Sequence, residues 1–475
     1  QYIRGAYLAR IDYGYLKNEL FTKSPATRVL FDVGERCLPN GTITCAPEQL
    51  KKETAGHWPD VPFDQICDSG VKCTDRTTPT FFTRKRLAKV TTQVLNASGQ
   101  YHPVDSWTLK HQFPATGDGL SPALWLASIQ QTGHVGGTLS LPPVTFIGVQ
   151  LPNRVDANEG RAPLVKWRVQ AVNNESGGEL RINYSAADCK PGDVPTADKN
   201  TRRCFPQRWA PPNEAEVTDW FHKYLVTQTI EIDRVAGSPN VVTDYEYLDG
   251  AAWHYADNIL VKPEHRTWSD FRGFGRVRVR EGDGQDGKRT LTEFRYFRGM
   301  HGDKQSDGSK RSAQVEDSEG VKLDDLDQYS GFEREEILYD GDGGAILTAT
   351  VEEPWSAKTA ESTQGGVTKA AHIVEAKSMV TRTALPGGKW RRTGEKRTYD
   401  TAGLLTRVEE KGDLATADDD QCIRYTYARN DAAWMLDYPS RVQKVAAGCG
   451  TSVAKQSADE IISDEKVEYD GQAHG

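Results

Sequence analysis

The sequence predicts a mainly β protein built from antiparallel hairpins, and three features lead to this prediction. The composition is typical of a turn-rich β protein, with 43 glycines among 475 residues and 37% hydrophobic residues. Short segments that alternate apolar and polar side chains recur between turns rich in Gly, Pro and Asn. A Tyr-Asp pair also repeats in similar surroundings. The length favours two or three domains, or one extended sheet, over a single core.

The clearest hairpin covers residues 267–298. Valines alternate with arginines across 276–280, which places the two residue types on opposite faces of a strand. The Gly- and Asp-rich run 281–287 predicts a turn, and alternation resumes across 292–296. We therefore expect an antiparallel hairpin with one buried face. Just before it, two glycines around a phenylalanine in 271–275 predict a bend in which the aromatic ring fills the corner.

Further strands are expected on both sides of this hairpin. Segments rich in β-branched and aromatic residues between turn signals predict strands at 27–33, 87–95, 107–113, 139–146, 167–172, 179–184, 241–248, 424–427 and 440–445. One helix is expected after Pro211, with Asn213 as its N-cap and apolar residues at helical spacing up to Tyr224. The polar segments 303–330 and 356–370 are expected to be surface loops.

Two regions are expected along the chain. Residues 1–165 form an irregular, β-rich N-terminal region with disulfide-closed loops, and residues 166–475 contain the more regular hairpins. The net charge of -8 gives no general attraction to nucleic acid or to an acidic membrane surface. No segment is apolar over the length that a membrane span needs. We therefore expect neither a nucleic-acid partner nor a membrane span.

The eight cysteines fall into four neighbouring pairs, each across a plausible loop. These are Cys37 and Cys45, Cys67 and Cys73, Cys189 and Cys204, and Cys422 and Cys449. An even number with this local spacing favours disulfides and an oxidising compartment. Zinc is the alternative, but no Cys-x-x-Cys or His-x-x-x-His spacing accompanies the cysteines. Spacing alone does not fix which cysteines pair, so the pairing is a hypothesis.

A Tyr-Asp unit recurs three times, at Tyr339-Asp340, Tyr399-Asp400 and Tyr469-Asp470. In the first two units a glycine follows three residues after the aspartate, and an apolar pair and a Val-Glu-Glu segment come next. Aspartate accepts hydrogen bonds at the first position of a tight turn, and glycine closes the fourth. The tyrosine ends a strand with its ring packed. Each hairpin cannot bury its apolar face alone, so neighbouring hairpins must extend one continuous sheet.

These motifs resemble the RHS/YD-repeat family. The segment Phe271-Arg272-Gly273-Phe274-Gly275, followed by an alternating strand, looks like part of the B components of insecticidal toxin complexes. The Tyr-Asp units look like the YD repeats of bacterial RHS proteins and teneurins. The resemblance implies antiparallel hairpins that curl into a spiral β shell, with few short helices, around a toxic or effector polypeptide. The dense repeats and core motif of RHS toxins are missing here, and the pattern stops near residue 471, so we expect a piece of a longer secreted bacterial protein.

No catalytic or cofactor-binding motif is apparent. The sequence contains no Gly-x-Ser-x-Gly elbow, Gly-rich phosphate loop or His-Glu-x-x-His. His222 and His254, which lie among aromatic residues, are the two histidines that we would test. The acidic clusters at 324–327, 340–342 and 418–420 could hold calcium, but each lacks the glycine and glutamate of an EF-hand loop, which favours solvated turns. We expect no catalytic residue, cofactor or metal.

Three functions follow as hypotheses, all outside the cell or at its surface. The first is a non-catalytic structural segment of a secreted shell, whose partner is the rest of its own polypeptide or an enclosed cargo domain. The second is an extracellular adhesion or glycan-binding module, in which Trp253, Trp268 and Trp390 could stack on sugars, although tryptophans more often fill the core of a β protein. The third is a cell-wall-associated hydrolase, which needs two converging carboxylates.

Overall fold

The computed structural model describes residues 6–16, 19–20, 22–67, 70–72, 82–156, 160–211, 214–285, 287, 289–450 and 458–469. Strands account for 52% of the residues, which confirms the predicted mainly β, antiparallel fold. The chain divides into two compact units, residues 1–194 with 207–242 and residues 195–206 with 243–475. Residue 165, where the sequence suggested a boundary, is the first residue of a strand inside the first unit.

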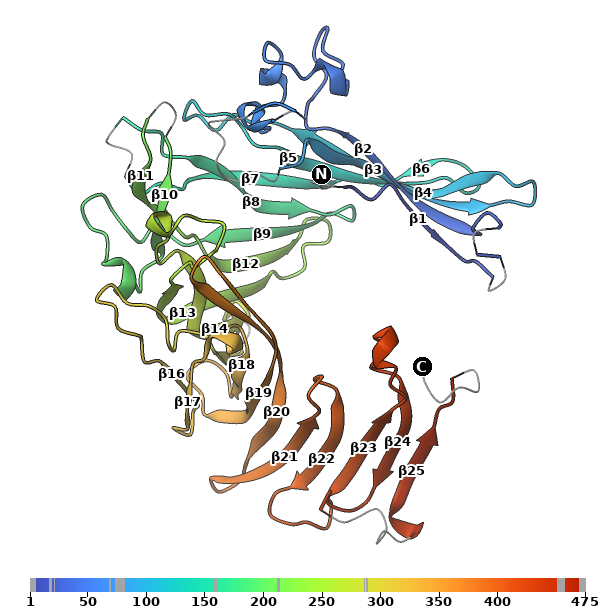
Figure 1. The fold of residues 1–475 in the computed structure, drawn as a ribbon, viewed down its shortest axis with the longest axis vertical. Helices are drawn as coiled ribbons and strands as arrows, with labels where there is room; N and C mark the ends of the chain where they lie inside the picture. Colours follow the sequence, from blue (N-terminus) through green and yellow to red (C-terminus); the bar gives the residue numbers. More distant parts are fainter. Residues whose placement is uncertain are drawn as a thin grey trace. The chain divides into compact units, whose positions relative to one another are not determined.

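The first unit is built on one antiparallel sheet (Figure 1). Its strands are β1 (Arg10–Tyr13), β2 (Thr27–Glu35), β3 (Lys85–Leu95), β4 (Tyr101–Gln112), β5 (Trp125–Gly133), β6 (Leu139–Ser140), β7 (Val144–Pro152), β8 (Val165–Asn173), β9 (Gly178–Tyr184) and β12 (Val226–Asp233). They pair in the order β1-β2-β3-β4-β5-β7-β8-β9-β12, and β6 pairs with one end of β5. The segment 139–146, expected as one strand, is divided between β6 and β7.

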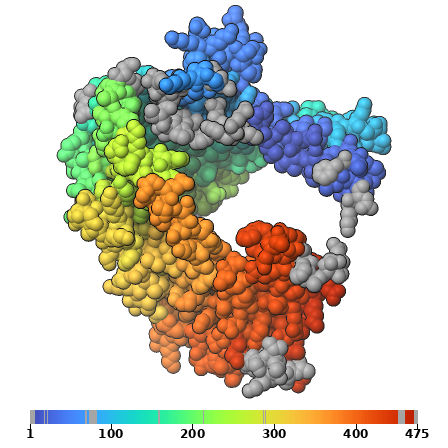
Figure 2. Space-filling view, in the orientation of Figure 1, coloured from blue at the N-terminus to red at the C-terminus, as the bar shows by residue number. Residues whose placement is uncertain are grey.

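A loop-rich lobe is inserted between β2 and β3. It contains the 3-10 helices η1 (Pro47–Gln49), η2 (Ala55–His57) and η3 (Phe63–Gln65) and a small core of Cys37, Trp58 and Val61. Figure 2 shows this lobe in blue, standing out from the rest of the first unit. The buried carboxylate of Glu35, at the end of β2, accepts a hydrogen bond from Trp58 Nε1 at 3.1 Å and pairs with Arg84 at 3.1 Å. One side chain thus ties the lobe to the sheet.

The prediction of a helix after Pro211 is wrong. Residues Val217–His222 form strand β11, which pairs with β10 (Cys204–Trp209), and the proposed cap Asn213 lies outside the described residues. The helical spacing of the apolar residues was misleading because Val217 and Thr218 are β-branched and aromatic residues follow them, a composition that favours strands. Phe221 packs edge-on against Trp209, with ring centroids 6.0 Å apart.

The second unit is a meander in which strands follow one another in sequence order (Figure 1). Its main strands are β13 (Val241–His254), β14 (Asp270–Glu281), β15 (Thr292–Tyr296), β18 (Glu333–Tyr339), β19 (Ile346–Gln364), β20 (Val367–Leu385), β21 (Lys389–Tyr399), β22 (Leu405–Asp413), β23 (Gln421–Tyr427), β24 (Pro439–Val445) and β25 (Ile461–Lys466). Each pairs antiparallel with the next in that order. Strands β16 (Gln314–Glu316) and β17 (Lys322–Asp324) form a separate hairpin.

The remaining helices of the described residues are single 3-10 turns. They are η4 (Ala197–Lys199), η5 (Pro263–His265), η6 (Asp327–Tyr329), η7 (Asp431–Ala433) and η9 (Ala458–Glu460). Within the part of the chain that the structure describes, the helices are too short to cross a lipid bilayer.

The prediction of a surface loop at 356–370 is also wrong. Strands β19 and β20 continue through it as a long two-stranded ribbon, and Gly365 and Gly366 form its turn with φ angles of +56° and +76°. A Gly-Gly pair between strands is a strong hairpin signal because both turn residues need positive φ. The sequence lacks apolar alternation here because both faces of the ribbon are exposed to solvent.

The β14–β15 hairpin has the expected pairing but an unexpected buried face. Val277 lies opposite Phe294 in the β14–β15 ladder. The opposite, charged face is the more deeply covered, since Glu293 is 1% exposed whereas Leu338, on the valine side, is 42% exposed. The segment that joins β15 to β18 lies over the charged face, as its contacts below show.

Candidate functional site

Disulfides join cysteines that the sequence analysis paired. Cys37 bonds Cys45, and Cys422 bonds Cys449. The second of these disulfides forms a buried cluster with Val445, at the end of β24 and the beginning of β23. Cys67, Cys189 and Cys204 are also disulfide-bonded, and Cys73 lies outside the described residues.

The turn at Asp400 has the geometry that its sequence suggests. Asp400 Oδ1 accepts hydrogen bonds from the backbone N–H groups of Ala402 at 2.8 Å and Leu404 at 2.9 Å. Gly403 has a φ of +80°, and a Cβ at this position would lie 2.8 Å from the Ile373 side chain. Glycine is therefore required both for the backbone conformation and for space. Arg429 donates to the other carboxylate oxygen at 2.7 Å, which ties the turn to the end of β23.

The turn at Asp340 is longer than the turn at Asp400. The backbone N–H of Asp340 donates to the carbonyl of Ala345 at 2.8 Å, and the N–H of Asp400 donates to the carbonyl of Leu404 at 2.9 Å. The matching glycines therefore sit in turns of different length. Asp342, inside the longer turn, forms an ion pair with Arg280 at 3.0 Å, which fixes the turn against β14.

The same closed turn occurs at three places where no tyrosine precedes it. Asn96, Asn174 and Asp317 each accept, at Oδ1, the backbone N–H groups two and four residues later, over distances of 2.7 to 3.0 Å. Each has a glycine three residues after the first position, at Gly99, Gly177 and Gly320. The recurring signal is therefore Asx-x-x-Gly, and the search for Tyr-Asp missed these copies.

Tyrosine hydroxyls join adjacent strands of the second unit. Tyr399 donates to the carbonyl of Ala376 at 2.8 Å, and Tyr469 donates to that of Pro439 at 2.9 Å. Tyr427, which no aspartate follows, donates to the carbonyl of Leu405 at 2.7 Å. In each case a tyrosine at or just beyond the end of one strand bonds the preceding strand. Asp470, the partner of Tyr469 in the sequence motif, lies outside the described residues.

The predicted bend at 272–275 is a bulge between β13 and β14. Gly273 has a φ of +77°, and the pairing register between the two strands shifts on both sides of the Ala251–Phe274 pair. Phe274 is buried and packs against Tyr247, with ring centroids 5.0 Å apart. The aromatic ring thus fills the inside of the bend.

The two other residues of this bend make polar and close contacts. Arg272 donates to Asp270 at 2.7 Å and pairs with Asp327 at 2.9 Å, so it joins the bend to helix η6. At Gly275 a Cβ would lie 3.3 Å from the Asp249 carboxylate. The small residue allows this carboxylate to approach the strand.

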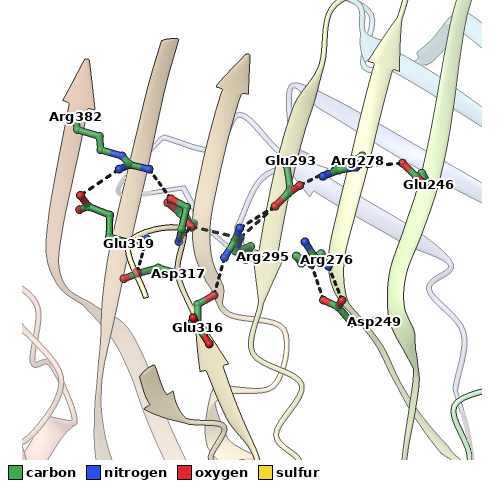
Figure 3. Close-up of polar contacts among 12 residues, drawn as sticks. Glu246, Asp249, Arg276, Arg278, Glu293, Arg295, Glu316, Asp317, Glu319 and Arg382 are labelled. Atoms are coloured by element: carbon green, nitrogen blue, oxygen red, sulfur yellow. Dashed lines mark hydrogen bonds and ion pairs between the residues drawn. The ribbon is translucent and has the colours of Figure 1, made fainter. Parts of the chain in front are cut away.

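A buried ionic network crosses the charged face of the second-unit sheet (Figure 3). Glu293 accepts a hydrogen bond from Arg278 at 2.7 Å and another from Arg295 at 3.1 Å. Arg295 also lies 3.4 Å from the carboxylate of Glu335, which is 0% exposed. At the edge of the network, Arg276 and Asp249 form two hydrogen bonds of 2.7 Å. Charges alternate along the row Glu246, Arg278 and Glu293, whereas Arg276 lies directly opposite Arg295 and both arginines are neutralised by carboxylates.

The turn of the β16–β17 hairpin closes over this network. The backbone N–H of Ser318 donates to Glu335 at 2.7 Å, and the Ser318 hydroxyl bonds the other oxygen of the same carboxylate. Arg334, on β18, donates to Asp317 at 2.6 Å, and both side chains are 4% exposed. A segment expected to be a surface loop therefore places buried charges against the sheet.

Two arginines from β20 and β21 bind the same turn. Arg382 donates to the Ser318 hydroxyl at 2.6 Å and lies 3.1 Å from Glu319. Arg392 donates to both carboxylate oxygens of Glu319, at 2.8 and 2.5 Å. Charged residues of β18, β20 and β21 thus hold one turn, and Figure 3 shows Glu319 beside Arg382. The fork of a guanidinium suits such two-point contacts.

Burial and charge shift the pKa values of this site in opposite directions. Burial raises the pKa of Glu335, although its hydrogen bonds with Ser318 act in the other direction. The hydrogen bond from Arg392 lowers the pKa of Glu319. On β15, burial and the nearby carboxylate of Glu333 raise the pKa of Tyr296 to about 12.

The candidate histidines have structural contacts. His254 Nε2 lies 3.4 Å from the buried carboxylate of Asp303, and its Nδ1 lies 2.9 Å from the Tyr255 carbonyl. His222 is 9% exposed, and burial, followed by the charge of Arg168, lowers its pKa. These contacts pack both rings into the fold.

The acidic clusters take part in caps and ion pairs. Asp325 accepts the backbone N–H groups of Arg298 and Gly299, both at 2.7 Å, and Asp420 pairs with Lys411 at 3.0 Å. Among the described residues, no group of three or more His, Cys, Asp or Glu side chains has the geometry of a metal site. Trp253, one of the candidate sugar-stacking residues, is 2% exposed and packs between Phe205 and Phe271.

Comparisons with known proteins give low similarity. No protein-family model matches the chain, and no curated protein matches it. The solved structures that resemble it include the TcdB2-TccC3 crystal structure, with 10% identity, a TM-score of 0.47, and coverage of 95% of this chain and 38% of that chain. TcdB2-TccC3-Cdc42 shows 10% identity, a TM-score of 0.45, and coverage of 92% and 36%. A Photorhabdus luminescens Tc holotoxin pore with a mutated TccC3 shows 14% identity, a TM-score of 0.36, and coverage of 76% and 20%. The chain therefore spans less than two fifths of these proteins, and we base no functional inference on the likeness.

Proposed function

We propose that this chain is a non-catalytic wall segment of a secreted RHS/YD-type β shell that encloses a toxin or other effector polypeptide. The observation that carries the proposal is the strand order of the second unit. From β13 to β25, with only the β16–β17 hairpin set aside, every strand pairs with the next strand along the chain. Such a sheet extends sideways one hairpin at a time, because each new strand covers the open backbone edge of the strand before it.

The tyrosine contacts support the same interpretation. Tyr399, Tyr427 and Tyr469 each bond a carbonyl of the preceding strand. A hydrogen bond of this kind contributes about 1 kcal/mol, in addition to the ladder between the strands. Such hydrogen bonds add a local contact between each strand of a wall and the strand before it.

The proposed mechanism is physical sequestration. A continuous sheet excludes proteases from the polypeptide on its inner side, and it keeps that polypeptide away from the producing cell until release. The partner is the rest of the natural polypeptide or a separate cargo domain. The Cys37–Cys45 and Cys422–Cys449 disulfides fit a function outside the cell, where such bonds persist.

Protease protection of the full-length natural protein tests this proposal. We expect a segment outside this chain to resist trypsin in the native protein and to become cleavable in the Arg334→Met variant, which leaves the buried carboxylate of Asp317 without its partner. Arg391→Met is the matched control, because it removes the same charge from a side chain that is 56% exposed. Equal cleavage of every outside segment in native and denatured protein would falsify the proposal.

A glycan-binding function is the second candidate, and one exposed side chain favours it. Trp434 is 80% exposed and has a φ of +55°, an unusual conformation for an aromatic residue. Its indole is therefore presented to solvent at the turn between β23 and β24. Retention on cell-wall glycans that Trp434→Ala abolishes, but Trp253→Phe does not, would support adhesion. Equal retention of both variants would contradict it.

A further inference from the structure

The C-terminal strands form a pocket that differs from the ionic network in its charge. It has a volume of about 480 Å³ and lies across the end of β21 and the strands β22, β23 and β24. The side chains that line it include Thr398, Arg407, Arg424, Thr426, Arg441 and Gln443. Three arginines therefore share one pocket, and none of the residues that line it is acidic.

Two of these arginines lie directly opposite each other. Arg407 on β22 pairs in register with Arg424 on β23. Side chains at opposed positions have Cβ atoms roughly 5 Å apart, and like charges at such positions destabilise a sheet. Burial and the charge of Arg407 lower the pKa of Arg424, which reflects the same unfavourable placement of positive charge.

The neutralisation of charge is uneven around the pocket. Arg441 donates to both carboxylate oxygens of Asp464, each at 2.6 Å. The guanidinium of Arg407 instead donates to the Thr398 hydroxyl at 3.3 Å, and it forms no ion pair with a carboxylate of the described residues. Its positive charge is thus exposed at the mouth of the pocket.

The side chain of Gln443 lines the same pocket. Gln443, which lies opposite Arg424 on β24, is 4% exposed and lines the pocket. Its side-chain amide makes no hydrogen bond to the residues that the structure describes. The amide is not one of the fully buried polar groups that lack a partner, so it is open to the pocket and to a polar ligand there.

We propose that this pocket binds an oxyanion, that is, a phosphate, sulfate or carboxylate group. Arg407 and Arg424 donate charge-assisted hydrogen bonds from both sides, since guanidinium groups match the geometry of these anions. The Gln443 amide offers a further donor. Binding of an anion neutralises Arg407, which forms no ion pair with the described residues. The proposal goes beyond the wall function and does not depend on it.

The test measures binding of inorganic phosphate and sulfate to the full chain by calorimetry, at constant ionic strength. We expect saturable binding that Arg424→Gln weakens about tenfold, because one charge-assisted hydrogen bond is lost. Arg391→Gln removes the same charge from an exposed position outside the pocket and leaves the affinity unchanged. A glutamate-rich peptide that displaces phosphate would assign the site to polypeptide carboxylates, and no displacement would assign it to free oxyanions.

A second variant keeps the test informative if Arg424→Gln fails to fold. Arg407 is exposed, so Arg407→Gln leaves the sheet intact. Without anion, this variant should melt at a higher temperature than the wild type, because the repulsion is gone. With phosphate, its melting temperature should rise less than that of the wild type. Absence of saturable binding, or equal affinity in all variants, overturns the proposal.

Discussion

Two stretches of one sheet face differ in how their opposed arginines are neutralised. In the covered stretch Arg276 lies opposite Arg295, and Arg382 lies opposite Arg392, but each of them has a carboxylate partner. Under the β16–β17 turn, Glu335 and Arg334 are almost completely buried, and each has partners of opposite charge. On β22 and β23, the opposed pair Arg407 and Arg424 has like charges. The comparison shows that this sheet buries charge where another segment of the chain neutralises it. On β22, the exposed Arg407 forms no ion pair with the residues that the structure describes.

The largest expected effect is on the covered stretch. Arg334→Met should lower the free energy of unfolding by about 3–5 kcal/mol, because the buried carboxylate of Asp317 loses its partner. Urea unfolding followed by tryptophan fluorescence measures this. The exposed control Arg391→Met should cost less than about 1 kcal/mol. Equal losses would mean that the network is not a stabilising feature of the sheet.

The next largest effect on stability is expected at the Cys422–Cys449 disulfide. Replacing Cys422 and Cys449 by serine should destabilise the protein by about 2–4 kcal/mol, because the bond closes a loop with a sequence separation of 27. The same change at Cys37 and Cys45, with a separation of 8, should cost about 1 kcal/mol less. Thermal unfolding of both double variants gives the comparison, and the reverse order would show that loop length does not set the effect.

The tyrosine joints should have a smaller effect. Tyr399→Phe removes the hydrogen bond to Ala376 and should cost about 1 kcal/mol. Tyr425→Phe is the control, because the Tyr425 hydroxyl makes no hydrogen bond to the described residues. If both variants unfold at the same urea concentration, the hydroxyl contact does not join the strands.

The smallest effect concerns the partly exposed edge of the network and depends on pH. Glu319→Gln should cost about 0.5–1 kcal/mol at pH 7, because the contact with Arg392 loses its charge. Its pKa in the folded protein lies below the ordinary 4.5, so its stabilising contribution is complete above pH 4.5. That contribution disappears as the pH falls through the folded pKa. The free energies of unfolding of the wild type and of Glu319→Gln should therefore become equal in acid. A difference that persists there would contradict the stabilising contact between Glu319 and Arg392.

The sequence predicted those features that depend on local chemistry. Alternation in 276–280 gave the β14–β15 pairing, and the aspartate and glycine of the turn at 400–403 gave its hydrogen bonds. The sequence did not predict the features that depend on tertiary contacts. The valine pattern could not show that the charged face is the one covered, because the covering hairpin comes from residues 314–324 and shows no apolar signal of its own.

The candidate site was therefore only partly predictable. Arg276 and Arg278 were visible as an arginine face, whereas Glu335 and Asp317 are recognisable only once the strand register brings them together. The same holds for Arg407 and Arg424, which lie 17 positions apart in the sequence and meet through strand pairing. Periodicity identifies strands, but only the register places charges next to one another.

A cryo-EM reconstruction of the full-length natural protein decides whether these strands act as a wall. We predict that β13 to β25 form part of a continuous curved sheet with polypeptide density on its inner side. Separate compact domains, with solvent on both faces of this sheet and no enclosed chain, would contradict the proposed function.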